Sequence, residues 1–259
     1  MSQPKRPSFP ARLGPASASP VVRPTRSGAS SSRPAVMPAP LGVGLDSAAV
    51  RARMVQRLAA GGVSSTAVLQ AMGAVDRHLF VDTALVNQAY EDTSLPIGLG
   101  QTISKPSVVA RMIELLLQCE AAKSGMGRIL EIGTGCGYQA AVLGRVAREV
   151  YSIERLRGLH EKARNNLRPL RLTNVHLIFG DGMLGFAQGA PYAGIISAAG
   201  GEHVPSAWCD QLAVGGRLVA PMAQAGGQQI LLVIDKTPYG FNESVLEAVN
   251  FVPLKSGIA

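Results

Sequence analysis

Residues 128–139 read R-I-L-E-I-G-T-G-C-G-Y-Q, and this stretch determines the fold that we expect for the chain. Residues 129–132 suit a buried strand, and they run directly into glycines at alternate positions, Gly133, Gly135 and Gly137. A helical pattern follows the last glycine at once. Strand, tight glycine turn and helix in this order are typical of the first unit of a nucleotide-binding α/β sheet.

The spacing of these glycines excludes two common nucleotide-binding motifs. A dinucleotide-binding turn reads G-x-G-x-x-G, but Tyr138 occupies the place of its third glycine. The phosphate-binding motif G-x-x-x-x-G-K-S/T is absent from the sequence. The pattern is instead E-x-G-x-G-x-G, in which Glu131 stands two residues before the first glycine. Alone, such a turn also fits a strand-to-helix connection that binds nothing.

From residue 128 onward, strand and helix patterns alternate as in a parallel sheet with crossover helices. We expect about seven strands, at 129–132, 150–153, 175–179, 194–197, 218–221, 230–234 and 244–251, and helices at about 138–147, 156–168 and 205–212. The last two strands should be antiparallel, because a short turn around Tyr239 and Gly240 joins them. The expected fold class is therefore α/β, with a Rossmann-like, mostly parallel twisted sheet and helices on both faces.

The chain before the sheet divides into a tail and a helical segment. Residues 1–40 hold nine of the 17 prolines and eight serines, so we expect a disordered tail over residues 1–45. Its prolines exclude the amphipathic helix of an organellar transit peptide. We then expect three helices: one capped by Asp46 or Ser47 and ending at residues 61–62, one from residue 64 or 65 to 72, and one from Pro106.

Charge and composition limit the kinds of partner. The net charge is +8, but residues 1–46 alone carry six basic residues and one acidic residue, so the folded part is nearly balanced and we expect no nucleic acid partner. No apolar run is long enough to span a bilayer, and we expect a cytoplasmic protein without membrane contact. The three cysteines and four histidines show no metal-ligand spacing, so no metal is assigned.

Acidic residues follow the next two strands of the expected sheet. Glu154 ends one strand, and Asp181 lies between two glycines after the other. The carboxyl ends of parallel strands meet at one edge, so both acids should lie near the glycine turn. There Glu154 can accept both hydroxyl hydrogens of a ribose, and Asp181 can accept a hydrogen bond from an adenine amine. The alternatives are a solvated acid that pairs with a nearby arginine for Glu154, and a simple turn aspartate for Asp181.

Further stretches resemble a known family. They read L-P-I-G-L-G-Q-T-I-S-K-P (95–106), V-V-A-R-M (108–112), G-D-G (180–182) and F-V-P-L (251–254). Together with the glycine turn they resemble the Rossmann-like S-adenosylmethionine-dependent methyltransferases, and within these the protein-L-isoaspartate O-methyltransferase family. Q-T-I-S is the most specific part. The resemblance covers roughly residues 47–259 and implies one methyltransferase domain over 46–259. In it, an N-terminal helical and substrate-loop segment (46–127) precedes a cofactor-binding sheet (128–259).

The resemblance also implies roles for particular residues. Ser104 is the implied active-site residue, and Thr102 and Ile103 are implied to bind the acceptor with it. The cofactor, S-adenosylmethionine, is implied to bind Glu131, Gly133, Thr134, Gly135, Gly137, Glu154, Asp181 and Gly182. The implied partners are proteins and peptides that contain isoaspartyl residues, and we expect a monomer.

The sequence departs from the family pattern in one place. The fourth strand and its exit usually read close to D-A-I-I-V-T-A-A-P, whereas this chain has A-G-I-I-S-A-A-G-G at 193–201. Ala193 replaces an aspartate, Ala198 replaces a threonine, and the proline is missing. These changes put the contacts of that loop in question.

The expected reaction is methyl transfer to the free carboxylate of an L-isoaspartyl residue, which initiates repair of a damaged protein through a succinimide. A carboxylate is ionised at neutral pH and needs no strong base, so a neutral hydroxyl such as that of Ser104 suffices to orient it. Ser104 could also be the N-cap of the helix that begins at Pro106. The alternatives for the whole chain are a methyltransferase with a nucleic acid or small-molecule acceptor, and a catalytically weakened homologue that binds the cofactor.

Overall fold

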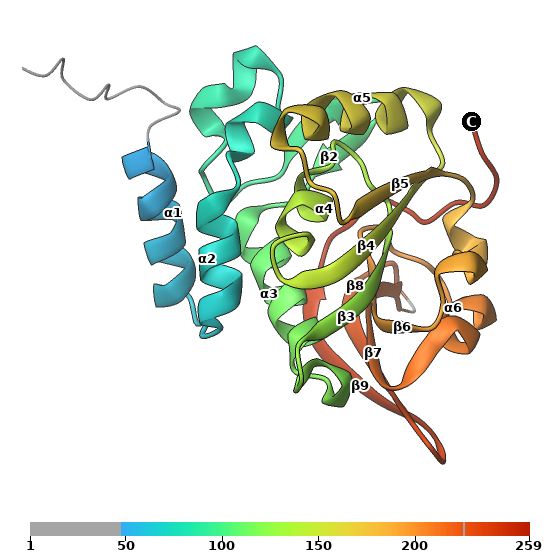
Figure 1. Ribbon diagram of the computed structural model, residues 1–259. Helices are drawn as coiled ribbons and strands as arrows, with labels where there is room; N and C mark the ends of the chain where they lie inside the picture. Colours follow the sequence, from blue (N-terminus) through green and yellow to red (C-terminus); the bar gives the residue numbers. More distant parts are fainter. Residues whose placement is uncertain (1–47, 225) are drawn as a thin grey trace, which may run out of the picture. The chain divides into compact units, whose positions relative to one another are not determined.

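The computed structural model describes residues 48–224 and 226–259 (Figure 1). The tail expected over residues 1–45 and the capping residues Asp46 and Ser47 lie outside the described residues. No helix of the described part is long and apolar enough to cross a bilayer.

A seven-stranded sheet in the order β5-β4-β3-β6-β7-β8-β9 organises the described residues. Its strands are β3 (Met126–Ile132), β4 (Ala147–Glu154), β5 (Val175–Phe179), β6 (Tyr192–Ser197), β7 (Leu212–Ala223), β8 (Gln229–Thr237) and β9 (Gly240–Val249). The first five pair in parallel. Strand β8 is antiparallel to both of its neighbours. The predicted sheet and its antiparallel final pair are thus confirmed, whereas the antiparallel β7–β8 pair was not predicted. It follows from a connection over 224–228 that is too short for a crossover helix.

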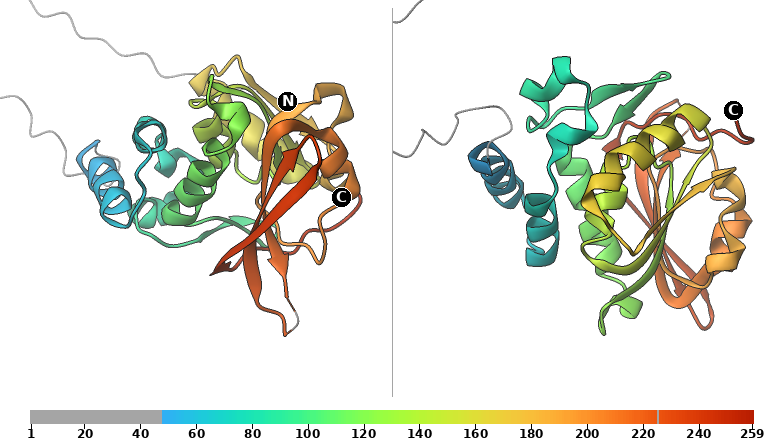
Figure 2. Two further views of the ribbon diagram at one scale, coloured as in Figure 1. Left: turned by 90° about the horizontal axis from the view of Figure 1, so that it is seen from below. Right: turned by 45° about the horizontal axis from the view of Figure 1, so that its top comes forward.

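Helices cover both faces of this sheet, as Figures 1 and 2 show. They are α1 (Ala48–Ala60), α2 (Thr66–Ala74), α3 (Pro106–Leu117), α4 (Tyr138–Leu143), α5 (Arg157–Leu167) and α6 (Ser206–Gln211). Neighbouring residues of β3 point to opposite faces. Ile129 packs in a core with side chains of α1 to α5, and Leu130 packs in a second core with Trp208 of α6. Helices α1 and α2 lie outside α3 (Figure 1).

Helix α4 is shorter than the sequence predicted. We expected a helix over about 138–147, but α4 ends at Leu143 and Ala147 already opens β4. Gly144 ends the helix at a close approach to β5, where an added Cβ would lie 2.7 Å from a methyl carbon of Val175. The side-chain amide of Asn174 donates to the carbonyls of Gly144 and Ala147, at 2.9 and 3.1 Å. These tertiary contacts, which the local pattern does not contain, set the end of the helix.

The Pro- and Gly-rich stretch 95–106 forms a short hairpin of β1 (Leu95–Gly98) and β2 (Gln101–Ile103), followed directly by α3. Its turn has three consecutive residues with positive φ: 98° at Gly98, 53° at Leu99 and 69° at Gly100. Short 3-10 helices make the remaining connections: η1 (Arg77–Phe80), η2 (Thr83–Gln88), η3 (Glu120–Ala122), η4 (Arg168–Leu170), η5 (Gly182–Leu184) and η6 (Ala187–Gly189).

Candidate active site

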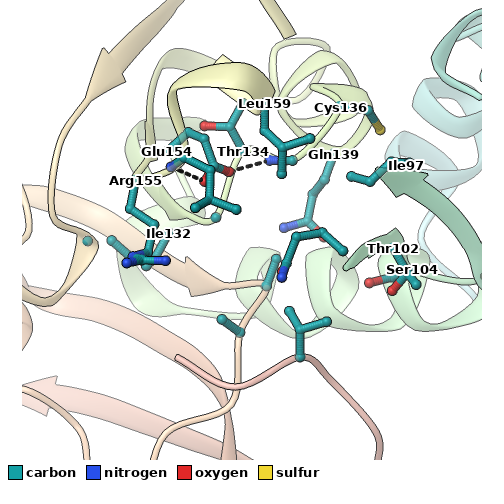
Figure 3. Close-up of a pocket in the computed structure, with 18 of the residues that line it drawn as sticks. Ile97, Thr102, Ser104, Ile132, Thr134, Cys136, Gln139, Glu154, Arg155 and Leu159 are labelled. Atoms are coloured by element: carbon teal, nitrogen blue, oxygen red, sulfur yellow. Dashed lines mark hydrogen bonds between the residues drawn. The ribbon is translucent and has the colours of Figure 1, made fainter. Parts of the chain in front are cut away.

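A pocket opens at the carboxyl ends of β3, β4 and β6, and Figure 3 shows the side chains that line it. One wall is the glycine turn after β3, with Gly133 and Gly135. The hairpin and the residues after it, up to Ser104, form a second wall. Residues 252–255 near the end of the chain contribute a third. Segments far apart in the sequence therefore meet around one cavity.

Glu154 is held in place beside the glycine turn, as the sequence predicted for a residue at this edge. Its side chain is only 5% exposed. The N–H of Gly135 donates to one carboxylate oxygen and the N–H of Leu156 donates to the other, each at 2.9 Å. The positive φ of Gly135, 57°, allows the turn to aim its N–H in this way. Each oxygen keeps a lone pair, so the fixed carboxylate can still accept the hydroxyl hydrogens of a ribose.

Glu131 lies beneath the glycine turn and does not line the pocket. It is fully buried, and the hydroxyl of Ser152 donates a short hydrogen bond to its carboxylate. A further hydrogen bond of 2.7 Å joins Ser152 to the hydroxyl of Thr134, which lines the pocket. Burial raises the pKa of Glu131 to about 8, although the hydrogen bond from the Ser152 side chain opposes this shift. Hydrogen bonds therefore connect Glu131 to the pocket through Ser152 and Thr134.

The predicted cofactor-binding glycines have different surroundings. Gly133, Gly135 and Gly182 line the pocket. Gly137 does not, because it is packed against α5, where an added Cβ would lie 3.1 Å from the side chain of Leu167. Close packing against α5 therefore explains why a glycine is needed at position 137.

Asp181 lies just outside the pocket lining, beside the last residues of the described chain. One carboxylate oxygen accepts the N–H of Met183, at 2.9 Å, and the other accepts the N–H of Gly257, at 2.6 Å. It is thus a turn aspartate that also anchors residues 255–259, which we call the C-terminal segment. Ala259 of this segment pairs with the backbone of Arg155 and Arg157, at 2.9 and 2.8 Å. The adenine contact expected for Asp181 stays a prediction.

The predicted acceptor loop reaches the pocket with all three of its residues, Thr102, Ile103 and Ser104. Thr102 and Ser104 are seen together in Figure 3, away from Glu154. Among the described contacts, the Ser104 hydroxyl makes no hydrogen bond. The alternative role as N-cap is wrong, because Lys105 is the N-cap residue of α3. The carboxylate of Asp92 instead accepts the N–H and the hydroxyl of Ser107, at 2.8 and 2.7 Å.

Several residues of the site were not assigned from the sequence. Gln139 and Cys136 line the pocket, although both belong to the stretch first examined. Burial raises the pKa of the Cys136 thiol to about 11, so it is a neutral thiol near pH 7. Val252 and Leu254 also line the pocket. The F-V-P-L stretch singled out these two residues in the sequence, but it did not indicate what they contribute to the site.

The two alanines that depart from the family pattern lie in different places. Ala198 lines the pocket and packs against the glycine turn, where a Cβ at Gly133 would lie 3.5 Å from its own. Ala193 lies near the amino end of β6, away from the pocket, and its carbonyl accepts a weak hydrogen bond from the Cys119 thiol at 3.7 Å. Only the change at Ala198 therefore touches the site.

The fold and the site together define a Rossmann-like methyltransferase that uses S-adenosylmethionine. The residues fit this cofactor, because a glycine turn and a buried, fixed carboxylate lie side by side at the edge of the sheet. The family model for protein-L-isoaspartate(D-aspartate) O-methyltransferase matches residues 49–259, so the chain belongs to this family.

Relatives and solved structures agree with this assignment. The chain is 58% identical to a protein-L-isoaspartate O-methyltransferase of Methylibium petroleiphilum, over 97% of this chain and 96% of the relative. It is 60% identical to a protein-L-isoaspartate O-methyltransferase of Leptothrix cholodnii, over 83% of this chain and 77% of the relative. A solved protein-L-isoaspartate O-methyltransferase superposes with a TM-score of 0.72 at 29% identity, over 80% of this chain and 67% of the other. A putative one from Plasmodium falciparum, in complex with S-adenosyl-L-homocysteine, shares the fold with a TM-score of 0.68 at 24% identity, over 79% and 98%.

Proposed function

We propose that this chain transfers the methyl group of S-adenosylmethionine to the free carboxylate of L-isoaspartyl residues in damaged proteins and peptides, which initiates repair through a succinimide. One observation carries the proposal: a single pocket is lined by the glycine turn with Glu154 and by the loop with Ser104. The monomeric state, the cytoplasmic location and the division at residues 45 and 127 stay predictions.

The residues assigned to the cofactor hold it and orient it. Glu154 would hold the ribose hydroxyls, and Gly133 and Gly135 let the ligand approach the backbone closely. When bound, S-adenosylmethionine supplies a methyl group that its positively charged sulfur has already activated. The protein therefore needs only to fix the acceptor in line with it. Correct orientation can supply ~7 to 11 kcal/mol of the barrier reduction.

The residues assigned to the acceptor orient its carboxylate without adding a charge to the site. The reference pKa of a carboxylic acid is about 4, so the acceptor is ionised at neutral pH and no general base is required. The Ser104 hydroxyl can donate one hydrogen bond to one carboxylate oxygen and leave the other free to attack. A cation at this position would stabilise the carboxylate before reaction and reduce its reactivity.

A pair of peptides tests the proposal. The two peptides have the same sequence and differ only in whether one residue is an L-isoaspartyl or a normal aspartyl residue. With labelled cofactor, we expect methyl ester formation on the isoaspartyl peptide and little on its twin. Equal labelling of both, or labelling of nucleic acid in preference, contradicts the proposal.

A further inference from the structure

Arg77 is a completely buried arginine that the proposed chemistry does not use. It opens η1 and is 0% exposed. No carboxylate of the described residues forms an ion pair with it. Burial of a cation without a paired anion is costly, and it lowers the pKa of the Arg77 guanidinium. The guanidinium is held in this buried place by hydrogen bonds to backbone carbonyls, so its contacts need a specific explanation.

The contacts of Arg77 join three segments that are separate in the sequence. Its Nε donates to the carbonyl of Ala89, at 2.7 Å, directly after η2. One terminal nitrogen donates to the carbonyl of Ser104, at 2.8 Å. The central carbon of the guanidinium lies over the ring of Tyr138, 4.7 Å from the ring centroid. A guanidinium suits this place because it can donate two divergent hydrogen bonds while its charge lies over an aromatic ring.

Two of these partners flank the proposed reaction. Ser104 carries the hydroxyl of the acceptor loop. Tyr138 is fully buried and is the first residue of α4, directly after the glycine turn. Arg77 thus connects the backbone of the acceptor loop to the structure that follows the cofactor turn. Because methyl transfer depends on in-line placement, a shift of about 1 Å between loop and turn can cost ~10²-fold in rate.

We propose that Arg77 is a positioning residue for methyl transfer, which fixes the distance between the acceptor loop and the cofactor turn through Ser104 and Tyr138. The inference rests on the proposed function for its activity measurement. Arg77 lies outside the pocket lining, so it acts through its neighbours and not by contact with either substrate.

The test compares Arg77→Lys and Arg77→Gln with Arg217→Lys. Arg217 is the control because it also donates to a backbone carbonyl, that of Leu115 at 2.9 Å, but at the far end of α3 and with Asp235 as an ion-pair partner. We expect kcat on the isoaspartyl peptide to fall about 10- to 100-fold in both Arg77 variants. Binding of S-adenosyl-L-homocysteine, measured by calorimetry, should change by less than about threefold. Arg217→Lys should lower the melting temperature and leave kcat unchanged.

Amide hydrogen exchange provides a measurement that does not depend on activity. Exchange at residues 101–105 should rise at least about tenfold in the Arg77 variants, with little change at residues 126–132, and should not rise in Arg217→Lys. A kcat within about twofold of the parent in folded, ligand-binding Arg77 variants overturns the proposal, as does unchanged loop exchange. If the parent chain itself fails on the isoaspartyl peptide, the proposed function fails, while the exchange result still decides the role of Arg77.

Discussion

The hydroxyl of Ser104 is free to serve an acceptor, because the first turn of α3 is already capped by Asp92. We expect Ser104→Ala to reduce turnover on an isoaspartyl peptide about 10- to 100-fold, the value of one hydrogen bond to a charged group. Cofactor binding should remain, since Glu154 and the glycine turn are untouched. Steady-state kinetics and calorimetry measure the two quantities. Ser107→Ala, three positions further along, is the control and should retain activity; equal turnover in Ser104→Ala would exclude the role of its hydroxyl.

The raised pKa of Glu131 predicts that the free energy of unfolding depends on pH. Its pKa is 4.5 in an unfolded chain and about 8 in the folded one. The folded state therefore holds a proton that the unfolded state releases, and stability from this group is lost as the pH rises from 4.5 to 8. The slope approaches about 1.4 kcal/mol per pH unit. Glu131→Gln keeps the acceptor for Ser152 but cannot ionise.

Denaturant unfolding without cofactor tests this at pH 5 and at pH 8. The variant should gain stability relative to the parent chain as the pH rises, because it lacks the penalty of a buried carboxylate. A constant difference between the two proteins would show that Glu131 ionises with an ordinary pKa in the fold.

At the scale of elements, the C-terminal segment holds together the turns beside the site, and only its first residue, Lys255, lines the pocket. Gly257 holds Asp181, and Ala259 pairs with the backbone directly after Glu154. Deletion of residues 256–259 removes these contacts and frees the turn that carries Glu154. We expect the affinity for S-adenosyl-L-homocysteine to fall about tenfold through faster dissociation, with kcat at saturating cofactor little changed. Stopped-flow and calorimetric measurements check this, and an unchanged affinity would contradict it.

The elements that could be predicted from sequence are those with strong local patterns. The apolar runs and the glycine turn were sufficient to predict the strands of the sheet. The short turn at Tyr239 and Gly240 was sufficient to predict that the last two strands are antiparallel. The end of α4 could not be predicted, because the helix ends where Gly144 packs closely against Val175 of β5, a contact that the local sequence does not contain. In the site, Glu154 reached the pocket because parallel strands end at a common edge. Arg77 gave no sequence signal, because its partners are two backbone carbonyls and a ring distant along the chain.

For the whole molecule, charge is divided unevenly between the tail and the remainder. Residues 1–46 carry six basic residues and one acidic residue of a chain with net charge +8. The family model begins only at residue 49. We therefore expect a chain that begins at Ala48 to keep its kcat/KM on isoaspartyl peptides within about twofold, since the predicted acceptor and cofactor residues all lie between Thr102 and Gly182. Comparison of the two chains at several salt concentrations measures this. Loss of activity on the peptide would instead show that the basic tail takes part in the reaction.

The buried thiol of Cys136 has a consequence for the selectivity of the reaction. A thiolate is a far stronger nucleophile than a carboxylate, and Cys136 is one of the residues that line the pocket proposed for the methyl donor. With a pKa of about 11, only about one thiol in ten thousand is ionised at pH 7. Burial therefore suppresses a competing acceptor inside the enzyme itself. The carboxylate of the substrate is a weaker nucleophile but is fully ionised, so we expect it, and not the thiol of the cofactor turn, to accept the methyl group.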